Sequence, residues 1–264
     1  MSIFDKHANS IHLDKVQNYY SKVLQSTADL KSSACCSTET VPEHIKPILS
    51  KIHSEVVSRF YGCGIPVPPA AEGCTAIDLG CGTGRDVFLL SAQVGPQGRV
   101  IGIDMTDDQL AVARRHVEFH TKEFGFAAPN VDFRKGFIED LRHADIADNS
   151  IDLVVSNCVI NLSPAKRQVF SEIMRVLKPG GELFFSDIFC DRRLPEECSN
   201  DPVLLGECLG GAMYKEDFRR LMFELGQPDL RVMSSTEVTT HDPTIPRSNV
   251  KSAMLASFQS HSVY

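Results

Sequence analysis

Three glycines at alternate positions, Gly80, Gly82 and Gly84, follow a β-branched and apolar run that ends at Leu79. A helical pattern begins at Arg85, so the glycines lie between an expected strand and an expected helix, where backbone amides can receive a polar ligand. A nicotinamide fingerprint has glycines at the first, third and sixth positions. Counted from Gly80, the sixth position is Arg85 and the third glycine takes the fifth. The spacing therefore disfavours a nicotinamide dinucleotide.

An acidic residue, Asp104, closes the next apolar run and lies 20 residues after Gly84. A carboxylate at this place can accept hydrogen bonds from vicinal ribose hydroxyls. The loop D-x-G-x-G-x-G, which begins at Asp78, together with Asp104 resembles the S-adenosylmethionine site of Rossmann-like methyltransferases. A glycine turn with no ligand is the alternative, and it leaves the register of loop, helix and acid unexplained.

The elements that must position these residues alternate along the chain. Two amphipathic helices are expected first, over His12–Leu30 and from Pro42 to about Val57, with a polar linker between them. From Thr75 onward strands alternate with helices, which predicts a mostly parallel, doubly wound α/β sheet with helices on both faces. The expected strands are Ala76–Leu79, Val100–Asp104, Val131–Arg134, Ile151–Ser156, Leu183–Asp187 and Leu230–Val238. The expected helices are Asp86–Gln93, Asp107–Phe124 with Thr106 as N-cap, Lys166–Leu177 and Lys215–Leu225.

Two further segments complete this interpretation. Lys178-Pro179-Gly180-Gly181 predicts a helix end, and residues 191–212 are expected to form an insertion with a short helix near Pro202–Cys208. The tail from Ala253 to Tyr264 resembles the start of a last strand, which in the methyltransferase topology lies antiparallel between the fifth and sixth strands. We expect the chain to be truncated at this end. The expected division is a helical cap over 1–70, a cofactor domain over 71–190, and a substrate-binding insertion with the final sheet elements over 191–264.

Composition narrows the function classes. The chain has 264 residues, 42% hydrophobic and 23% charged, which is ordinary for a globular protein. Lys and Arg number 27 against 34 Asp and Glu, and no basic stripe is present, which disfavours nucleic acid as a partner. The N-terminus has no apolar signal region and no apolar run reaches 18 residues, so we expect a cytoplasmic protein that does not span a membrane.

Nine cysteines are the unusual feature of the composition. An odd count in an unsecreted chain argues against a disulfide scaffold and for thiols that are reduced, reactive or metal-binding. No C-x-x-C pair occurs, which disfavours a zinc ribbon or a thioredoxin-type motif.

Residues just past the strand ends should form the wall of a cofactor pocket, because ligands of doubly wound sheets sit beyond the carboxyl ends of the strands. Met105 follows Asp104 and offers a polarizable face to an adenine ring. Ile138 and Glu139 follow the third strand, where Glu139 can accept from an adenine amino group, and Asn157 and Cys158 follow the fourth. The simpler alternative is that Met105 and Ile138 are plain core and that Glu139 lies in a solvated turn.

Three thiols far apart in the chain could meet at this pocket. Cys158 lies directly after the fourth strand, Cys208 lies in the insertion, and Cys63 is flanked by Gly62 and Gly64. Taken singly, a cysteine of an unsecreted protein is more often an inert core residue.

At this point a more specific resemblance emerges. The segments YGCG (61–64), DLGCGTGRD (78–86), GIDMT (102–106), SNCVINL (156–162), RVLKPGGELFFSD (175–187) and GECLGGA (206–212) occur in order. Together they resemble the arsenite S-adenosylmethionine methyltransferase family, whose fold is the Rossmann-like class I methyltransferase fold.

The resemblance implies roles for individual residues. Cys158 and Cys208 match the pair that binds trivalent arsenic, and Cys63 matches the third thiol. Cys35 or Cys36 matches an N-terminal cysteine that exchanges disulfides with Cys63 during turnover. The residues that match cofactor contacts are Tyr61, Asp78, Gly80, Gly82, Gly84, Arg85, Asp104, Met105, Ile138, Glu139, Asn157 and Cys158.

The expected chemistry follows from these residue types. Trivalent arsenic is soft and takes three thiolates in a pyramid with one lone pair, which can attack a sulfonium methyl without a general base. Each methylation raises the oxidation state of arsenic, so neighbouring thiols are expected to return it to the trivalent state and leave a disulfide for an external thiol reductant. No metal other than the metalloid is expected.

The expected substrate is therefore arsenite, the expected reductant is of thioredoxin or glutathione type, and the expected protein is a monomer. The Cys35-Cys36 doublet and the absence of the family's longer C-terminal region are departures from the family pattern. Two other functions remain open on the sequence. One is a methyltransferase for a small organic acceptor, and the other is a thiol-based metalloid-binding module.

Overall fold

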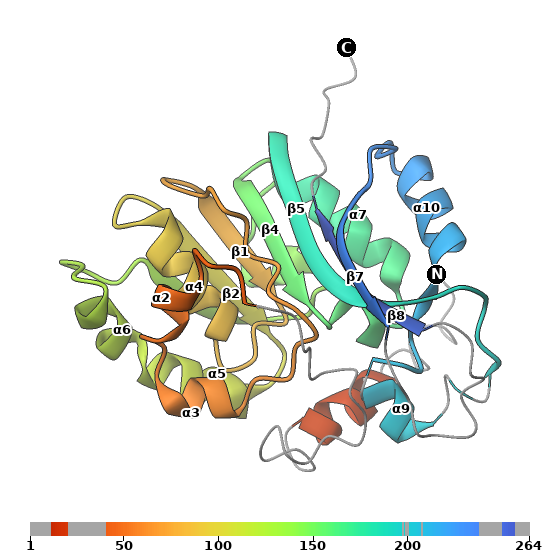
Figure 1. The fold of residues 1–264 in the computed structure, drawn as a ribbon, viewed down its shortest axis with the longest axis horizontal. Helices are drawn as coiled ribbons and strands as arrows, with labels where there is room; N and C mark the ends of the chain where they lie inside the picture. Colours follow the sequence, from red (N-terminus) through yellow and green to blue (C-terminus); the bar gives the residue numbers. More distant parts are fainter. Residues whose placement is uncertain are drawn as a thin grey trace.

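The computed structural model describes residues 12–20, 41–196, 198, 201–206, 208–237 and 250–256, and an eight-stranded sheet forms its centre (Figure 1). The strand order is β3-β2-β1-β4-β5-β8-β7, and β6 pairs with β5. The strands are β1 (Thr75–Leu79), β2 (Arg99–Asp104), β3 (Val131–Lys135), β4 (Ile151–Asn157), β5 (Leu177–Cys190), β6 (Met213–Tyr214), β7 (Arg231–Glu237) and β8 (Val250–Ala256).

The first five strands pair in parallel, and β8 lies antiparallel between β5 and β7. This is the Rossmann-like class I methyltransferase fold predicted from the sequence. The last strand has the predicted place and direction, but it begins at Val250 and not at Ala253.

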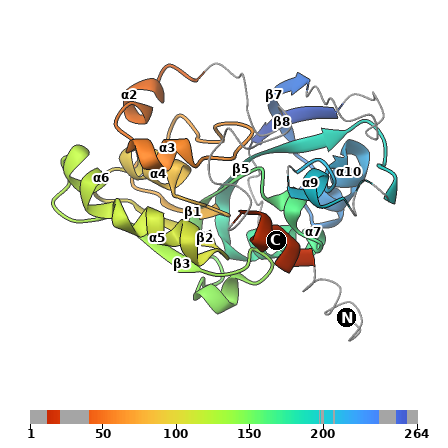
Figure 2. The same cartoon turned by 90° about the horizontal axis from the view of Figure 1, so that it is seen from below.

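Helices cover both faces of the sheet (Figure 2). Phe88 and Leu110 belong to a buried cluster on one face, and Phe170 and Phe218 belong to a cluster on the other. The helices are α2 (Lys46–Leu49), α3 (Ser54–Ser58), α4 (Arg85–Val94), α5 (Asp107–Arg115), α6 (Val117–Glu123), α7 (Lys166–Val176), α9 (Pro202–Gly206) and α10 (Lys215–Glu224). Within the described ranges, no helix has the length and apolar character needed to cross a membrane.

Two helices predicted as continuous are each broken at a histidine. The helix expected from Pro42 to Val57 is split into α2 and α3, because His53 has an extended backbone (ψ 137°) and its ring accepts the N–H of Glu55. The helix expected over Asp107–Phe124 is split at His116, whose ring stacks on His53 with centroids 3.8 Å apart. The pattern of apolar residues predicts the helical character correctly, but these contacts between distant segments are not visible in it.

The strand expected at Leu183–Asp187 is longer than predicted, because β5 begins at Leu177 and includes the segment Lys178–Gly181. Ile151 pairs with Leu177 and Leu153 with Glu182, so the intervening residues bulge out of register. The predicted helix end at this segment is confirmed, since α7 ends at Val176.

Residues 12–20 form a helical segment that contacts both the loop after β2 and the end of α9 (dark red in Figure 1). The Gln17 side chain donates to the carbonyl of Met105 (3.2 Å), and the Tyr20 hydroxyl donates to the carbonyl of Gly206 (2.7 Å) at the end of α9. The remainder of the helix expected up to Leu30 and the linker that follows lie outside the described residues.

Candidate functional site

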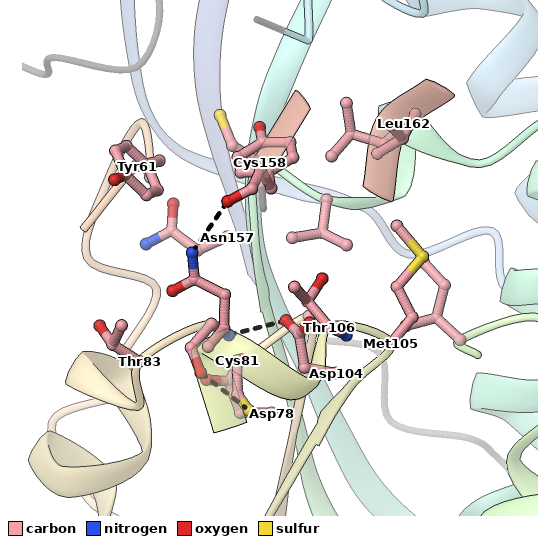
Figure 3. A pocket seen from close by; sticks show the side chains of 18 of the residues that line it. Tyr61, Asp78, Cys81, Thr83, Asp104, Met105, Thr106, Asn157, Cys158 and Leu162 are labelled. Carbon is pink, nitrogen blue, oxygen red and sulfur yellow. Dashed lines mark hydrogen bonds between the residues drawn. The ribbon is translucent and has the colours of Figure 1, made fainter. Parts of the chain in front are cut away.

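A cavity opens beyond the carboxyl ends of β1, β2, β3 and β4 (Figure 3). It contains about 930 Å³ of empty space, part of it open to solvent. The walls come from the segments after each strand, from the 12–20 segment, and from residues 59–62, which follow α3. The lining includes Tyr20, Tyr61, Asp78, Gly80, Gly82, Asp104, Met105, Gln109, Ile138, Glu139, Asn157 and Cys158.

The carboxylate of Asp104 is held by the backbone around it. The N–H of Gly82 donates to Oδ2 and the N–H of Thr106 donates to Oδ1, both at 2.8 Å. Burial raises the pKa of Asp104, and these two hydrogen bonds oppose the rise. Burial, followed by the charges of Asp86 and Asp104, also raises the pKa of Asp78. The wall therefore places two buried carboxyl groups, one from β1 and one from β2, where the sequence predicts that a ribose binds.

Further features of the cavity fit S-adenosylmethionine. The side-chain oxygen of Gln109 is buried at this wall without a hydrogen-bond partner, which leaves an acceptor for a ligand donor. A Cβ built on Gly82 would meet no atom within 4 Å, so the backbone there borders open space that a ligand can approach. Met105 and Ile138 supply apolar surface beside these polar groups.

Ten of the twelve residues predicted to contact the cofactor line the cavity, whereas Gly84 and Arg85 do not. Gly84 is the N-cap of α4 with φ 90°, and a Cβ there would lie 2.8 Å from the Phe133 ring. Arg85 is 8% exposed and points to the carbonyl of Gly64 (2.9 Å). Contact of these two residues with a cofactor stays a prediction. In the structure Gly84 provides the left-handed backbone at the start of α4, and Arg85 supports the segment at Gly64.

Two lining residues already have partners within the protein. Ser163 Oγ donates to Glu139 Oε1 (2.5 Å), which engages one oxygen of the carboxylate predicted to accept from adenine. The side chain of Asn157 binds the backbone of Cys63 and Gly64 and the carboxylate of Asp86.

The three predicted thiols do converge beside the cavity. Cys63 and Cys158 are joined by a disulfide with Cα atoms 5.7 Å apart, and Cys208 Sγ donates to the carbonyl of Cys158 at 2.7 Å. In the structure Cys63 is paired with Cys158, whereas the resemblance implies an exchange of Cys63 with Cys35 or Cys36 during turnover. Cys35 and Cys36 lie outside the described residues, so their part in turnover stays a prediction.

Backbone strain marks the same two positions. Cys158 has φ 57° and Cys208 has φ 63°, in the left-handed region that residues with a β-carbon seldom adopt. Such conformations cost about 1–3 kcal/mol and persist where the surroundings enforce them. Here the N–H of Cys158 donates to the carbonyl of Ser186 (2.7 Å), which fixes the turn after β4 to β5.

A buried carboxyl group adjoins the thiols. Cys158, Asp187 and Cys208 offer one ligand atom each, all within 4.8 Å of one another. Burial raises the pKa of Asp187 to about 7, although the N–H groups of Ile188 and Asn161 donate to it. Burial lowers the pKa of Lys166, and the charges of Asp187 and Cys208 oppose that change.

Sequence reasoning misses several residues of this site. Asp187 is predicted only as the last residue of a strand, although an acid at the end of a buried parallel strand is a recognisable signal. Gln109 and Tyr20 are predicted as helix residues, and no local pattern distinguishes them from other positions of an amphipathic helix. Ser186, whose hydroxyl lies 3.3 Å from Cys63 Sγ, is predicted as strand interior.

Known proteins resemble the chain at the level of both sequence and fold. Residues 70–226 match the methyltransferase domain family. The arsenite methyltransferase of Aquipseudomonas alcaligenes is 51% identical over 88% of this chain and 66% of its own length. The human arsenite methyltransferase is 46% identical over 88% of this chain and 62% of its own length. The chain thus spans about two thirds of the length of these relatives.

A solved structure supports the same relation. The crystal structure of an arsenic(III) S-adenosylmethionine methyltransferase from Chlamydomonas reinhardtii matches with a TM-score of 0.79 and 43% identity, over 83% of this chain and 74% of that one. The chain belongs to the methyltransferase domain family and, within it, to the arsenite S-adenosylmethionine methyltransferases.

Proposed function

We propose that this protein transfers methyl groups from S-adenosylmethionine to trivalent arsenic, arsenite and methylated arsenite, held by the thiolates of Cys63, Cys158 and Cys208. The observation that carries the proposal is the meeting of these three cysteines at the edge of the cavity with the glycine loop and Asp104. A methyltransferase acting on an organic acceptor needs no such group of thiols. A metalloid-binding module needs no cofactor cavity.

The thiols must be reduced before they can bind arsenic. The Cys63–Cys158 disulfide occupies two of the three sulfur ligands, so a reductant has to open it first. A thiol donor of thioredoxin or glutathione type would supply two electrons and two protons. We propose that the reaction takes place in the cytoplasm, because such donors keep thiols reduced there. We further propose that the protein acts as a monomer.

The residues of the cavity position the two reactants. Gly80, Gly82, Asp104, Met105 and Ile138 would hold S-adenosylmethionine, which when bound supplies an electrophilic methyl group on a sulfonium sulfur. The three thiolates hold arsenic with an unshared electron pair, so no proton has to be removed and the chain needs no general base. Cys158 belongs to both the cavity wall and the thiol cluster, which keeps the two sites adjacent.

The chain also supplies the electrons for the step after methylation. Arsenic loses two electrons formally in each transfer, and two cysteine thiols can return them by forming one disulfide and releasing two protons. Cys63 and Cys158 form such a disulfide in the structure. Cys35 and Cys36 are further candidates for this exchange. The division into a cap over 1–70, a cofactor domain over 71–190 and a substrate region over 191–264 is likewise a proposal.

The test is to incubate the purified protein with S-adenosylmethionine, arsenite and a thiol reductant, and to separate the arsenic species by chromatography with mass detection. We expect methylated arsenic that depends on both the cofactor and the reductant. Arsenite that is bound but never methylated would support the metalloid-binding module, and the absence of both binding and product would contradict the thiolate site.

A further inference from the structure

The side-chain amide of Asn157 is saturated by groups that hold Cys63 in place. Its Oδ1 accepts the N–H of Cys63 (3.0 Å) and that of Gly64 (3.2 Å). Its Nδ2 donates to the carbonyl of Gly64 (2.7 Å) and to Asp86 Oδ2 (2.7 Å). Asn157 immediately precedes Cys158, so the amide ties the chain at Cys63 to the residue next to its sulfur partner.

Arg85 also binds the segment at Gly64. Its Nη2 donates to the carbonyl of Gly64 (2.9 Å), and its guanidinium contacts Asp86 Oδ1 through Nε (2.8 Å) and Nη2 (2.7 Å). The guanidinium carbon lies 3.2 Å from the centroid of the Phe60 ring. Arg85, Asp86 and Asn157 are each at most 8% exposed, so these charge-assisted contacts are shielded from water.

The segment is also shaped to fit against this group. A Cβ on Gly62 would lie 2.6 Å from Cγ of Asn157 and 2.1 Å from the Phe60 ring. Only glycine lets the chain before Cys63 pack this closely on the amide. Four hydrogen bonds, three from the Asn157 amide and one from Arg85, therefore converge on Cys63 and Gly64.

We propose that Arg85, Asp86 and Asn157 form a buried clamp that positions Cys63 against Cys158, and that Arg85 serves the thiol site and not the cofactor. This inference rests on the proposed function for its purpose, but its geometry does not depend on it. Arg85 is a positioning residue, since it acts through Gly64 and Cys63 and does not line the cavity. The proposal departs from the cofactor role that the sequence predicts for Arg85.

The experiment compares the equilibrium of the Cys63–Cys158 disulfide with cofactor affinity in Arg85→Lys and Arg85→Met. The full protein is equilibrated with oxidised and reduced dithiothreitol. Formation of the protein disulfide releases two protons and two electrons from the two cysteines, and these convert one oxidised dithiothreitol to the reduced form. Mass spectrometry quantifies the peptides joined through Cys63 and Cys158, and calorimetry gives the affinity for S-adenosylmethionine.

We expect the disulfide equilibrium constant to fall roughly tenfold in Arg85→Met, because the variant cannot make the charge-assisted hydrogen bond to Gly64. Arg85→Lys should recover part of this loss, since a lysine keeps the charge beside Asp86 but not the planar fork. Cofactor affinity should stay within about twofold of the original in both variants, because the carbonyl of Gly64 lies outside the cavity wall. Asp104→Asn is the converse control, which should lose cofactor affinity and keep the disulfide equilibrium.

A loss of cofactor affinity with an unchanged disulfide equilibrium overturns the proposal, as do equal losses of both and no change in either. If both Arg85 variants fail to fold, Gly62→Ala tests the clamp through the disulfide equilibrium alone, and an unchanged value would contradict it. The dithiothreitol assay contains no arsenic. A wild-type protein that forms the disulfide but never methylates arsenite would therefore refute the proposed function while leaving the clamp intact.

Discussion

The cofactor side and the thiol side of the cavity are built in opposite ways. The cofactor wall uses residues close in the chain, with Gly80 and Gly82 after β1 and Asp104 and Thr106 after β2, joined by backbone hydrogen bonds to one carboxylate. The thiol side brings together sulfur atoms from far along the chain. Cys63 and Cys158 are separated by 95 residues, and Cys208 comes from the insertion.

The chemical surroundings differ as well. The cofactor wall combines apolar side chains with acceptors such as Asp104 and the side-chain oxygen of Gln109. The three cysteines instead lie in a buried cluster with residues such as Ile188, Leu204 and Leu209. The first wall thus depends on local backbone conformation, and the second depends on packing between distant segments. Changes on one side should therefore leave the other largely intact, which is the comparison that the following variants test.

The largest effect is expected from Cys208→Ser. A serine hydroxyl is a hard and weak ligand for arsenic, so loss of one of three thiolates should lower arsenite methylation by roughly a hundredfold or more. Affinity for S-adenosylmethionine should stay within about twofold, because Cys208 does not line the cavity. Both quantities are measured on the same preparation, by arsenic speciation and by calorimetry.

Cys74→Ser is the matched control, since Cys74 is half-buried and lies just before β1, outside the thiol cluster. Its activity should equal that of the original protein. Methylation retained by Cys208→Ser would refute the three-thiolate site and would make the two sides of the cavity less distinct than their construction suggests.

The converse change is Asp104→Asn on the cofactor side. It replaces a carboxylate that accepts two backbone hydrogen bonds, so affinity for S-adenosylmethionine should fall roughly ten- to a hundredfold, as expected for hydrogen bonds to a charged group. Arsenite binding by the reduced protein should not change. Asp107→Asn, at an exposed carboxylate that pairs with Lys135 on the surface, is the control and should have no effect on either ligand. Equal losses of cofactor and arsenite binding would show that the two sides are coupled.

A smaller effect is expected at Gly82, which has φ 52° and open space where a Cβ would lie. In Gly82→Ala the added methyl group should cost about 1 kcal/mol of stability from its left-handed backbone and lower cofactor affinity roughly tenfold by filling the approach to the loop. Gly180→Ala matches the strain, since Gly180 has φ +82° and no atom within 4 Å of a Cβ, but it lies in the β5 bulge. Cofactor affinity that falls equally in both variants would trace the effect to strain and not to the site.

How far the sequence predicts the molecule follows the same division. The glycine loop, Asp104 and the strand ends depend on short patterns, and their predicted places are confirmed. The meeting of Cys63 with Cys158 rests on the Asn157 amide, which binds backbone groups of Cys63 and Gly64 more than 90 residues away. No local pattern encodes such a contact. The resemblance, which rests on short motifs, likewise assigns Arg85 to the cofactor and does not contain its contact with Gly64.

The helix breaks at His53 and His116 likewise depend on contacts between distant segments. Each apolar pattern is continuous, but a histidine that contacts another segment takes precedence over helix propensity. The three thiols are predicted because the resemblance supplies them. Taken singly, each of the three positions favours an inert core cysteine.

The smallest expected effects concern pH, where a buried histidine packed on α4 and the buried carboxyl group beside the thiols should respond with opposite sign. Burial lowers the pKa of His120, which stacks on Phe88 of α4, to about 4. Because the unfolded chain takes up this proton near pH 6.5 and the folded chain does not, the stability is present above pH 6.5 and is lost as the pH falls toward 4. Asp187 keeps its proton up to about pH 7 in the folded protein, so its contribution grows as the pH falls from 7 toward 3.8.

Urea unfolding at pH 5 and pH 7 separates these contributions. His120→Asn should make acidification less destabilising than in the original protein, and Asp187→Asn should make it more destabilising, each by about 1 kcal/mol once the shifts are discounted for solvent screening. If His120→Asn and Asp187→Asn shift that difference in the same direction, the opposite signs predicted for these two buried groups are wrong.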